Sequence, residues 1–457
     1  MAGVISEMRI PETAPMLRDW FIDAPLLLAA RPAAPVLYSF SGTQQAELEF
    51  RAMRKLVVSL LFIFALGLNA FTLNAQPRFV HTDGKFLADA HGKKLLLRGT
   101  NLGNWLVTEG YMFQLEGGPQ STREIETLDN ELIGPTDAAK FWREYRDNYV
   151  TRKDIDFIAK AGFNTIRMPF HFRYFEAGNE EGFALVDRVT QWAKEDGLYV
   201  ILDMHCAPGG QTGANIDDSW NYPWLYEDEV SQQQAADIWE RIAAHYHDNP
   251  TILGYDLLNE PIPHFPKLQQ YNSKLEPVYR KLVAAVRTVD KNHVVILGGA
   301  QWDGNFSVFS APFDNNIMYT FHKYWMPPTQ DAVKPYVDFR DKYNVPIWMG
   351  ESGENTDDWI DKFRKVLDDD EINWTFWPYK KMKATSAPVT FAPPEHWDEI
   401  VAFAAKHYTM GDTEKAIAAR PSLEDSRAAF KDLLVRIRFE NCTVNEGYIK
   451  ALGAKVQ

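Results

Sequence analysis

The sequence predicts an α/β protein, a (β/α)8 or TIM barrel with an N-terminal β-hairpin and long loops that follow the strands. Two observations predict this fold. Eight short apolar segments are separated by segments with helical periodicity; such strands are typical of a parallel sheet covered by helices on both faces, and eight strand–helix units close a barrel. The segment "GTNLGN" (99–104) lacks the glycine spacing of a nucleotide-binding loop, which disfavours an open, doubly wound sheet.

The first element is the hairpin. In "RFVHTDGKFLADAHGKKLLLRG" (78–99), Asp83-Gly84 and His91-Gly92 are dipeptides typical of tight turns. The eight barrel strands are then expected at 95–99, 163–168, 199–204, 252–258, 293–299, 317–322, 346–350 and 372–377.

The segments between the strands carry apolar residues at helical spacing. The clearest stripe comprises Leu275, Val278, Leu282, Val286 and Val289. A final helix is expected over 422–436, where "SLED" is typical of a helix N-terminus. The barrel region, about 78–436, is longer than the roughly 250 residues usual for this fold. We expect the surplus in loops after the first and third strands (106–140 and 205–231) and after the fifth. No repeat or low-complexity linker interrupts 76–457, which predicts a single domain.

The N-terminal region predicts a targeting segment. Arg54 and Lys55 precede the apolar stretch "LVVSLLFIFALGLNAFTLNAQ" (56–76), the pattern of a secretory signal peptide over 53–75 with cleavage after Ala75. Residues 1–52 are then an upstream leader or an artefact of the gene start, with Met53 as the initiator. A secreted or periplasmic protein without a stable membrane anchor follows from this interpretation. The alternative is a transmembrane anchor, although the run is near the lower limit of about 17–20 residues needed to span a membrane.

Composition excludes some partners. The net charge of −14 argues against nucleic acid, because no basic patch is present to neutralise phosphates. The only cysteines, Cys206 and Cys442, form neither a disulfide framework nor a metal-ligand spacing, and the sequence does not decide whether they pair. We expect no cofactor and no metal.

Polar residues follow several predicted strands at their carboxyl ends, where a packed core would not need them. A single polar residue at a strand end is more often structural, but in a barrel all these ends face the same side. The residues are Arg167, Asp203, His205, Asn259, Glu260, His322, Tyr324, Glu351 and Trp377.

Two carboxylates stand out in this set. Glu260 and Glu351 end the fourth and seventh strands, which lie on opposite sides of an eight-stranded barrel, so the side chains can face each other across a pocket. A retaining glycosidase needs this layout, with one carboxylic acid protonating the leaving oxygen and the other carboxylate attacking the anomeric carbon. Arg167 near the nucleophile would keep it ionised. The spacing does not decide which glutamate is which.

Five motifs carry a resemblance to a known family. "RMPF" (167–170), "DMH" (203–205), "LLNEP" (257–261), "HKYW" (322–325) and "MGESG" (349–353) occur in the order typical of glycoside hydrolase family 5, the cellulase family. The resemblance implies that Glu260 is the acid/base and Glu351 the nucleophile. It further implies that Asn259 binds the sugar 2-hydroxyl, that Arg167 and Tyr324 orient the nucleophile, and that His205, His322 and Trp377 line the central subsite.

"RGTNLGNWL" (98–106) and "HCAPGGQTG" (205–213) resemble the exo-β-glucanase and β-glucosidase-like branch of the family. The expected substrate is a β-glucan or a related oligosaccharide; mannans and other β-glycosides stay open. Four aromatic residues of the acidic loop 217–229 either stack on neighbouring sugar units or anchor the loop: Trp220, Tyr222, Trp224 and Tyr226.

Two other classes of function compete with a glycosidase. A carbohydrate-binding barrel that has lost catalysis predicts a broken carboxylate pair, whereas both glutamates are present here. A metal-dependent barrel hydrolase needs a cluster of His and Asp ligands; no His-x-His spacing occurs at the carboxyl ends of the predicted strands, where Asp203, His205 and His322 are the candidates.

Overall fold

The computed structural model describes residues 79–410 and 413–456, together with residues 47, 50, 51 and 53. By its internal contacts the chain divides into two units, Met1–Asn74 and Ala75–Gln457. The predicted leader (1–52) and signal segment (53–75) lie almost entirely outside the described residues, so both stay predictions. Within the described part of the chain, no helix is long and apolar enough to cross a membrane.

The second unit contains a closed barrel of eight parallel strands, which confirms the predicted fold. Around the barrel the order is β10, β11, β4, β5, β6, β7, β8 and β9, with β9 pairing to β10 to close it. The strands are β4 (Arg98–Asn101), β5 (Thr165–His171), β6 (Tyr199–Cys206), β7 (Ile252–Asp256), β8 (Val294–Gly298), β9 (Ile317–His322), β10 (Ile347–Glu351) and β11 (Asn373–Phe376).

The expected hairpin is the start of a three-stranded antiparallel sheet: β1 (His81–Asp83), β2 (Phe86–Ala88) and β3 (Lys94–Leu95). The predicted strand 95–99 is therefore split, since Leu95 belongs to β3 and the barrel strand begins at Arg98. Leu97, between the two, is fully buried and packs in one cluster with Leu87 of β2 and Trp348 of β10. The small sheet thus covers the amino-terminal end of the barrel and leaves the other end open for a site.

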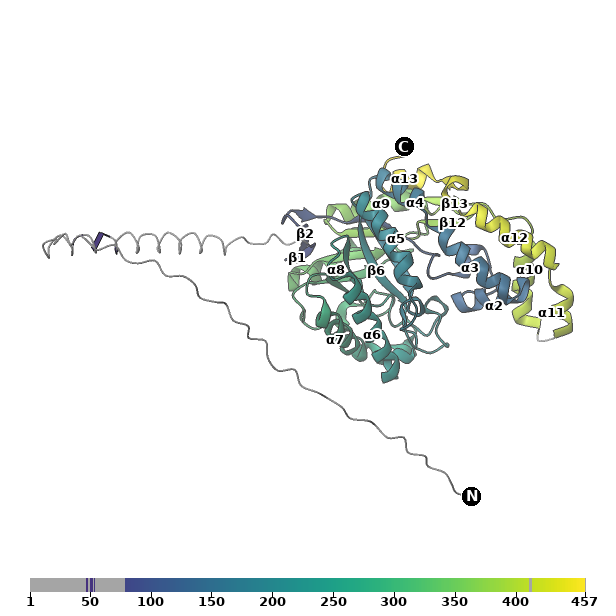
Figure 1. The fold of residues 1–457 in the computed structure, drawn as a ribbon, viewed down its shortest axis with the longest axis horizontal. Helices are drawn as coiled ribbons and strands as arrows, with labels where there is room; N and C mark the ends of the chain where they lie inside the picture. The colour runs from purple at the N-terminus through teal and green to yellow at the C-terminus, as the bar shows by residue number, and fades with distance from the viewer. Residues whose placement is uncertain (1–46, 48–49, 52, 54–78, 411–412, 457) are drawn as a thin grey trace, which may run out of the picture. The chain divides into compact units, whose positions relative to one another are not determined.

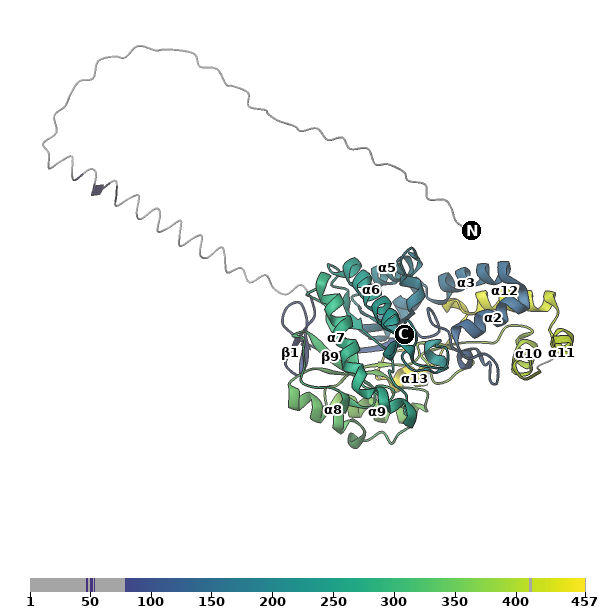
Figure 2. The ribbon, with the colours of Figure 1, turned by 90° about the horizontal axis from the view of Figure 1, so that it is seen from below.

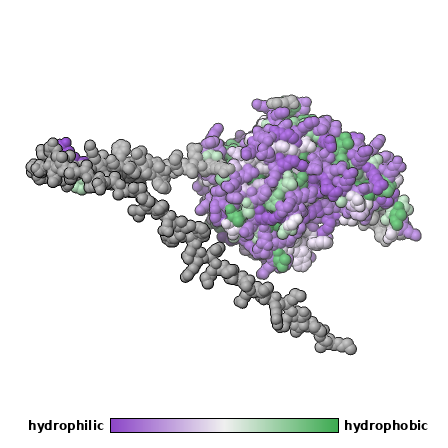
Figure 3. Space-filling view, in the orientation of Figure 1, coloured by the Kyte–Doolittle hydropathy of each residue, from purple (hydrophilic) through white to green (hydrophobic). Residues whose placement is uncertain are grey.

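Helices alternate with the strands and cover the barrel (Figures 1 and 2). They are α4 (Arg152–Ala161), α5 (Glu181–Glu195), α6 (Glu229–Tyr246), α7 (Asn272–Val289), α8 (Gln330–Tyr343) and α9 (Asp357–Asp369). The stripe predicted on α7 is correct: Leu275, Val278, Leu282 and Val286 are buried, and Val289 at the helix end is half-buried. The face drawn in Figure 3 is mostly hydrophilic, with scattered hydrophobic residues.

The prediction of a loop over 106–140 is wrong for its second half. Residues 122–149 form α2 (Thr122–Ile133) and α3 (Pro135–Tyr149), which pack with α12 (Leu423–Arg436). Figure 1 shows this helical extension beside the barrel, next to α10 (Trp397–Met410) and α11 (Thr413–Ala419). A capping box between Ser121 and Glu124 starts α2. The N-cap predicted at Ser422 is present, with its hydroxyl accepting from the backbone N–H of Asp425.

The remaining elements are short. They are η1 (Gly110–Phe113), η2 (Phe172–Phe175), η3 (Asn215–Asp217), η4 (Trp224–Tyr226), η5 (Pro266–Tyr271), η6 (Phe306–Val308), β12 (Lys380–Met382), β13 (Val389–Phe391), η7 (Phe439–Asn441), β14 (Thr443–Val444) and α13 (Glu446–Ala451). Segment 205–231 is largely loop, as expected, with the end of β6, η3, η4 and the start of α6 in it. Cys206 and Cys442 do not pair; both are free thiols.

Candidate active site

A cavity of about 760 Å³ opens at the carboxyl ends of the barrel strands, where the sequence predicts the site. Of the eight residues to which the family resemblance assigns a role, six line it: His205, Glu260, His322, Tyr324, Glu351 and Trp377. The other two, Arg167 and Asn259, are buried beside these residues and contact them directly.

Arg167 on β5 is fully buried and is the centre of a charged network. Its Nε donates to Asp256 Oδ2 at 2.9 Å, and its Nη2 donates to Asn259 Oδ1 at 2.8 Å and lies 3.1 Å from Asp203 Oδ1. Its Nη1 donates to Glu351 Oε1. A guanidinium with this many fixed partners cannot reorient, so Arg167 fixes the direction of the Glu351 carboxylate.

Glu351 ends β10 and has both carboxylate oxygens engaged. Oε1 accepts from Arg167, and Oε2 accepts from the hydroxyl of Tyr324 at 3.0 Å. Glu351 also lines the cavity, so a bound substrate can reach it.

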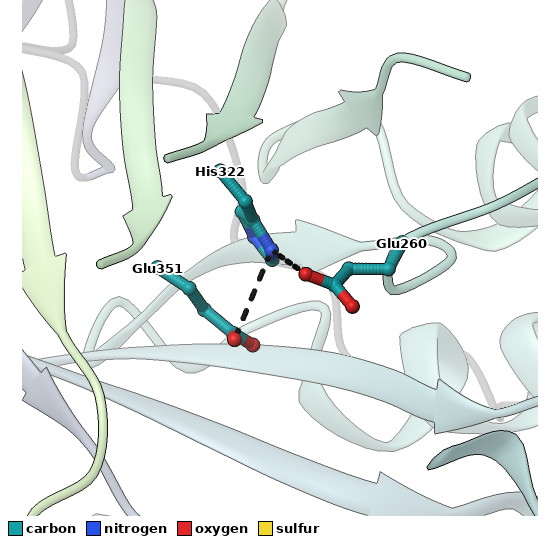
Figure 4. A group of neighbouring side chains, drawn as sticks. All are labelled: Glu260, His322 and Glu351. Carbon is teal, nitrogen blue, oxygen red and sulfur yellow. Dashed lines mark hydrogen bonds and ion pairs between the residues drawn. The ribbon is translucent and has the colours of Figure 1, made fainter. Parts of the chain in front are cut away.

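Glu260 follows β7 and has a left-handed backbone conformation, with φ of +47°. Its Oε1 lies 2.9 Å from His322 Nδ1, and the same nitrogen lies 3.8 Å from Glu351 Oε2 (Figure 4). One oxygen of each glutamate and a nitrogen of His322 all lie within 4.8 Å of one another. Burial raises the pKa of Glu260, an effect that the nearby His205, Arg167 and His264 partly oppose.

A second network holds Asn259. His205 Nδ1 lies 2.8 Å from Asp203 Oδ2, and His205 Nε2 lies 3.3 Å from Asn259 Nδ2. Burial lowers the pKa of His205 to about 4, so the ring is neutral at ordinary pH. With both ring nitrogens engaged, and with Asn259 Oδ1 taken by Arg167, the amide has one orientation.

Trp377 follows β11 and forms one wall of the cavity. Its indole lies parallel to the His205 ring, with centroids 5.4 Å apart, and its Nε1 donates to Tyr111 Oη at 2.8 Å. A Cβ atom on Gly103 would lie 2.6 Å from the indole, so glycine is needed there for the ring to lie flat. Because Trp377 lines the cavity, its ring is suited to stacking on a sugar ring.

Donor atoms that could hold a metal ion come together at two places among the described residues: Glu260, His322 and Glu351 in the cavity, and His396, Glu399 and Asp425 on the surface. The cavity set fits a metal poorly, because Arg167 places a positive charge on Glu351 and Tyr324 occupies its second oxygen. Asp203 and His205 bind each other and do not join His322 in a ligand set.

Several cavity residues are absent from the sequence-based set: Glu109, Tyr111, Trp302, Trp325 and Glu354. Burial raises the pKa of Glu109 to about 8, with further contributions from the charges of Glu351 and Glu260. The signal for Glu109 was present, since a lone glutamate follows the apolar run "WLV" (105–107) after the first barrel strand.

The aromatic residues of the loop 217–229 do not line the cavity. Tyr226 is buried and stacks on Tyr271 at 5.5 Å, so it anchors the loop. Trp220 is 71% exposed and lies against the Arg123 guanidinium. The same region contributes Asn215 and Ile216 to the cavity instead.

A closed parallel barrel with two facing glutamates at its carboxyl end is the arrangement of a glycoside hydrolase. Residues 124–383 match the cellulase family, glycosyl hydrolase family 5, over more than half of the chain. The chain belongs to this family.

Three curated relatives have names that indicate different substrates. A beta-xylosidase of Phanerodontia chrysosporium is 28% identical over 345 residues, which are 66% of this chain and 71% of the relative. Endoglucanase C of Acetivibrio thermocellus is 25% identical over 53% of this chain and 87% of its own length. A probable glucan 1,3-beta-glucosidase A of Emericella nidulans is 31% identical over 50% and 57%, respectively. Among solved structures, an endogalactoceramidase matches 82% of this chain and 84% of its own, with a TM-score of 0.55 and 20% identity, which supports the fold.

Proposed function

We propose that this chain is a retaining β-glycosidase that hydrolyses a β-linked glucan or related oligosaccharide by double displacement, with Glu351 as nucleophile and Glu260 as acid/base. One observation carries the retaining assignment: oxygens of the two glutamates lie within 4.8 Å of each other. Retaining enzymes have carboxyl groups about 5–5.5 Å apart, whereas inverting enzymes need about 6.5–9.5 Å to admit a water molecule.

In the first step, the Glu351 carboxylate attacks the anomeric carbon while Glu260 gives its proton to the departing glycosidic oxygen. Arg167 and Tyr324 hold Glu351 in position. In the second step, Glu260, now a carboxylate, takes a proton from water, whose oxygen attacks the anomeric carbon and releases Glu351. The raised pKa of Glu260 suits a group that must be protonated in one step and ionised in the next.

The central subsite follows from the same geometry. Asn259, fixed by Arg167 and next to His205, is placed to bind the sugar 2-hydroxyl, where hydrogen bonds strengthen in the transition state. His205 and His322 contribute further polar edges, and Trp377 offers a face for the sugar ring.

We further propose exo action, which releases one sugar unit from a chain end. The loop after β4 supplies Glu109 and Tyr111 to the cavity wall, and Glu354 lies in the same wall. Polar side chains that close one end of a cavity can bind the free hydroxyls of a terminal sugar. The names of the beta-xylosidase and glucan 1,3-beta-glucosidase relatives fit this mode, and that of the endoglucanase relative does not.

A panel of aryl β-glycosides and β-glucans, with product analysis by chromatography and anomer analysis by NMR, tests the proposal. We expect release of a single sugar with its β-configuration retained. Mixed oligosaccharides from a long glucan would contradict exo action, and the α-anomer would contradict the retaining mechanism. Binding of oligosaccharides without any turnover would favour the carbohydrate-binding barrel.

The pH profile gives a second expectation. Glu260 must be protonated for the first step, so kcat/KM falls as the pH rises through the pKa of Glu260, which burial raises above its usual value of 4.5. We expect the basic limb of the profile to shift to higher pH than an unperturbed glutamate would give. In the Glu260→Ala variant, measured on a substrate with a good leaving group, this limb should be absent. A basic limb that survives this substitution would assign the acid to another residue.

We also propose that the natural protein is secreted or periplasmic, through the signal segment 53–75. The basic residues, the apolar stretch and the small residue at Ala75 support it. Mass spectrometry of the mature protein from its natural source should find Gln76 at the N-terminus. Peptides from 1–52 in that protein would contradict the assignment.

A further inference from the structure

The turn after β8 contains three successive non-glycine residues in the left-handed region. Gln301, Trp302 and Asp303 have φ angles of +56°, +58° and +59°. Each such residue costs roughly 1–2 kcal/mol, and a conformation of this kind persists only where the surrounding structure holds it. Ala300 and Asn305 close the turn with reciprocal backbone hydrogen bonds of 3.1 and 2.7 Å. The turn directs the Asp303 side chain inward, where it is fully buried.

Asp303 meets the acid/base residue and its histidine partner. Its Oδ2 accepts from the backbone N–H of Glu260 at 3.1 Å and lies 3.3 Å from His322 Nε2. Nε2 has no hydrogen bond with the described residues, so a small rotation of either side chain would complete one with Asp303.

Two glycines make room for this arrangement. A Cβ atom on Gly298 would lie 1.8 Å from Asp303 Oδ1, and one on Gly350 would lie 2.9 Å from His322 Nε2. Any side chain at Gly298 would therefore displace Asp303. Glycines at the ends of two strands, β8 and β10, thus make room for a contact that the two-glutamate mechanism does not itself require.

We propose that Asp303 is a positioning residue, which acts as a neutral carboxylic acid that donates a hydrogen bond to His322 Nε2 and thereby selects the oxygen of Glu260 that carries the catalytic proton. With Nε2 as acceptor, the neutral ring bears its proton on Nδ1 and donates it to Glu260 Oε1, 2.9 Å away. Oε2 is then left to hold the proton that passes to the leaving group. This inference rests on the proposed role of Glu260.

The charges around these groups favour the neutral forms. Burial, together with the charges of Asp256 and Glu260, raises the pKa of Asp303 well above its usual value, against the opposing effect of Arg167. Burial lowers the pKa of His322 to about 3, so the ring is neutral and needs a donor at one nitrogen. An ionised Asp303 would instead accept from Nε2–H. Nδ1 would then accept the proton of Glu260 and hold it away from the substrate.

The test compares leaving groups. Phenyl and 2,4-dinitrophenyl glycosides of the preferred sugar present the same sugar to the protein and differ only in the leaving group. Dinitrophenolate departs without protonation, whereas phenolate needs a proton. We expect Asp303→Leu to lower kcat/KM roughly 10- to 100-fold for the phenyl glycoside, within the usual contribution of general acid catalysis, and less than about threefold for the dinitrophenyl glycoside. Asp303→Asn, which keeps a donor, should stay within about fivefold of wild type on both.

Controls separate this role from a structural one. Asn305→Ala removes a side chain that bonds to Ser307 and Gln301 in the same turn without touching His322, and it should affect both substrates equally. Equal losses on both substrates for Asp303→Leu, or an Asp303→Asn variant as impaired as Asp303→Leu, would overturn the inference. Glu260→Ala provides the reference: if it shows no dependence on the leaving group, the proposed function itself fails.

A second measurement needs no variant at Asp303. Nitrogen NMR of histidine-labelled wild-type protein distinguishes the two neutral tautomers, and a His322→Asn variant assigns the signal. We expect the proton of His322 on Nδ1. A proton on Nε2 would overturn the inference, even if Asp303→Leu failed to fold.

Discussion

Replacing Glu351 with glutamine is expected to lower kcat by about four orders of magnitude or more, as removal of a nucleophile usually does. An amide oxygen cannot form the covalent glycosyl–enzyme intermediate, and glutamine replaces one of the two oxygens that accept from Arg167 and Tyr324 with a nitrogen that cannot accept. Initial rates on the best aryl glycoside of the panel, with a detection limit below about one part in 10⁵ of the wild-type rate, measure the loss.

The matched control is Glu371→Gln. Glu371 is half-exposed and pairs with Lys94 at 2.7 Å, outside the cavity. The activity of Glu371→Gln should equal that of wild type, and thermal unfolding should show that Glu351→Gln and Glu371→Gln are both folded. Near-full activity of Glu351→Gln would reject Glu351 as the nucleophile, whatever the substrate.

The barrel and the central catalytic set could be predicted because both depend on local signals. A short apolar run predicts each strand, and in a parallel barrel the carboxyl ends of all strands lie on the same side. Glu260 and Glu351, some ninety residues apart, could therefore be placed across one pocket from the sequence alone, and the structure puts their oxygens within 4.8 Å. The family resemblance, and not the strand pattern, implied that Arg167 lies beside Glu351 and not beside Glu260, and the structure has this contact.

Other features depend on partners that a local pattern does not identify. The capping box at Ser121 predicts a helix, but its packing surface comes from α12, some three hundred residues later. In the loop 217–229 the aromatic residues are alike in sequence, yet Tyr226 points to Tyr271 and Trp220 to Arg123. Asp303 points inward because the turn that contains it has a left-handed backbone. Few residue types prefer this conformation, so the residue types in the segment do not predict the turn.

Replacing Arg167 with methionine is expected to destabilise the fold by about 3–5 kcal/mol at pH 8, the usual cost of removing one partner from a buried ion pair. Arg167 is fully buried and lies against Asp203, Asp256 and Glu351. Methionine fills much of the volume, so the loss reflects the carboxylates left without a cation. Urea unfolding followed by tryptophan fluorescence measures it. Arg173→Met, which breaks a partly exposed pair with Glu126, should cost only about 1 kcal/mol.

The loss of unfolding free energy in Arg167→Met should also depend on pH. Its direction follows from the effect of burial on two aspartate pKa values. Burial raises the pKa of Asp203 and of Asp256 to about 7 even with Arg167 present, against 3.8 for an ordinary aspartate. Without the guanidinium both values rise further. A group whose folded pKa is raised contributes stability that is present below its unfolded pKa and lost as the pH rises through the folded pKa. The destabilisation of Arg167→Met relative to wild type should therefore be smallest near pH 5, where both aspartates are protonated in the variant and in wild type. It should be largest above pH 7, where the aspartates of wild type ionise beside a cation and those of the variant have none. A loss under 1 kcal/mol that is flat between pH 5 and pH 8 would mean that the carboxylates are stabilised by their other neighbours, and that Arg167 serves only to orient Glu351 and Asn259.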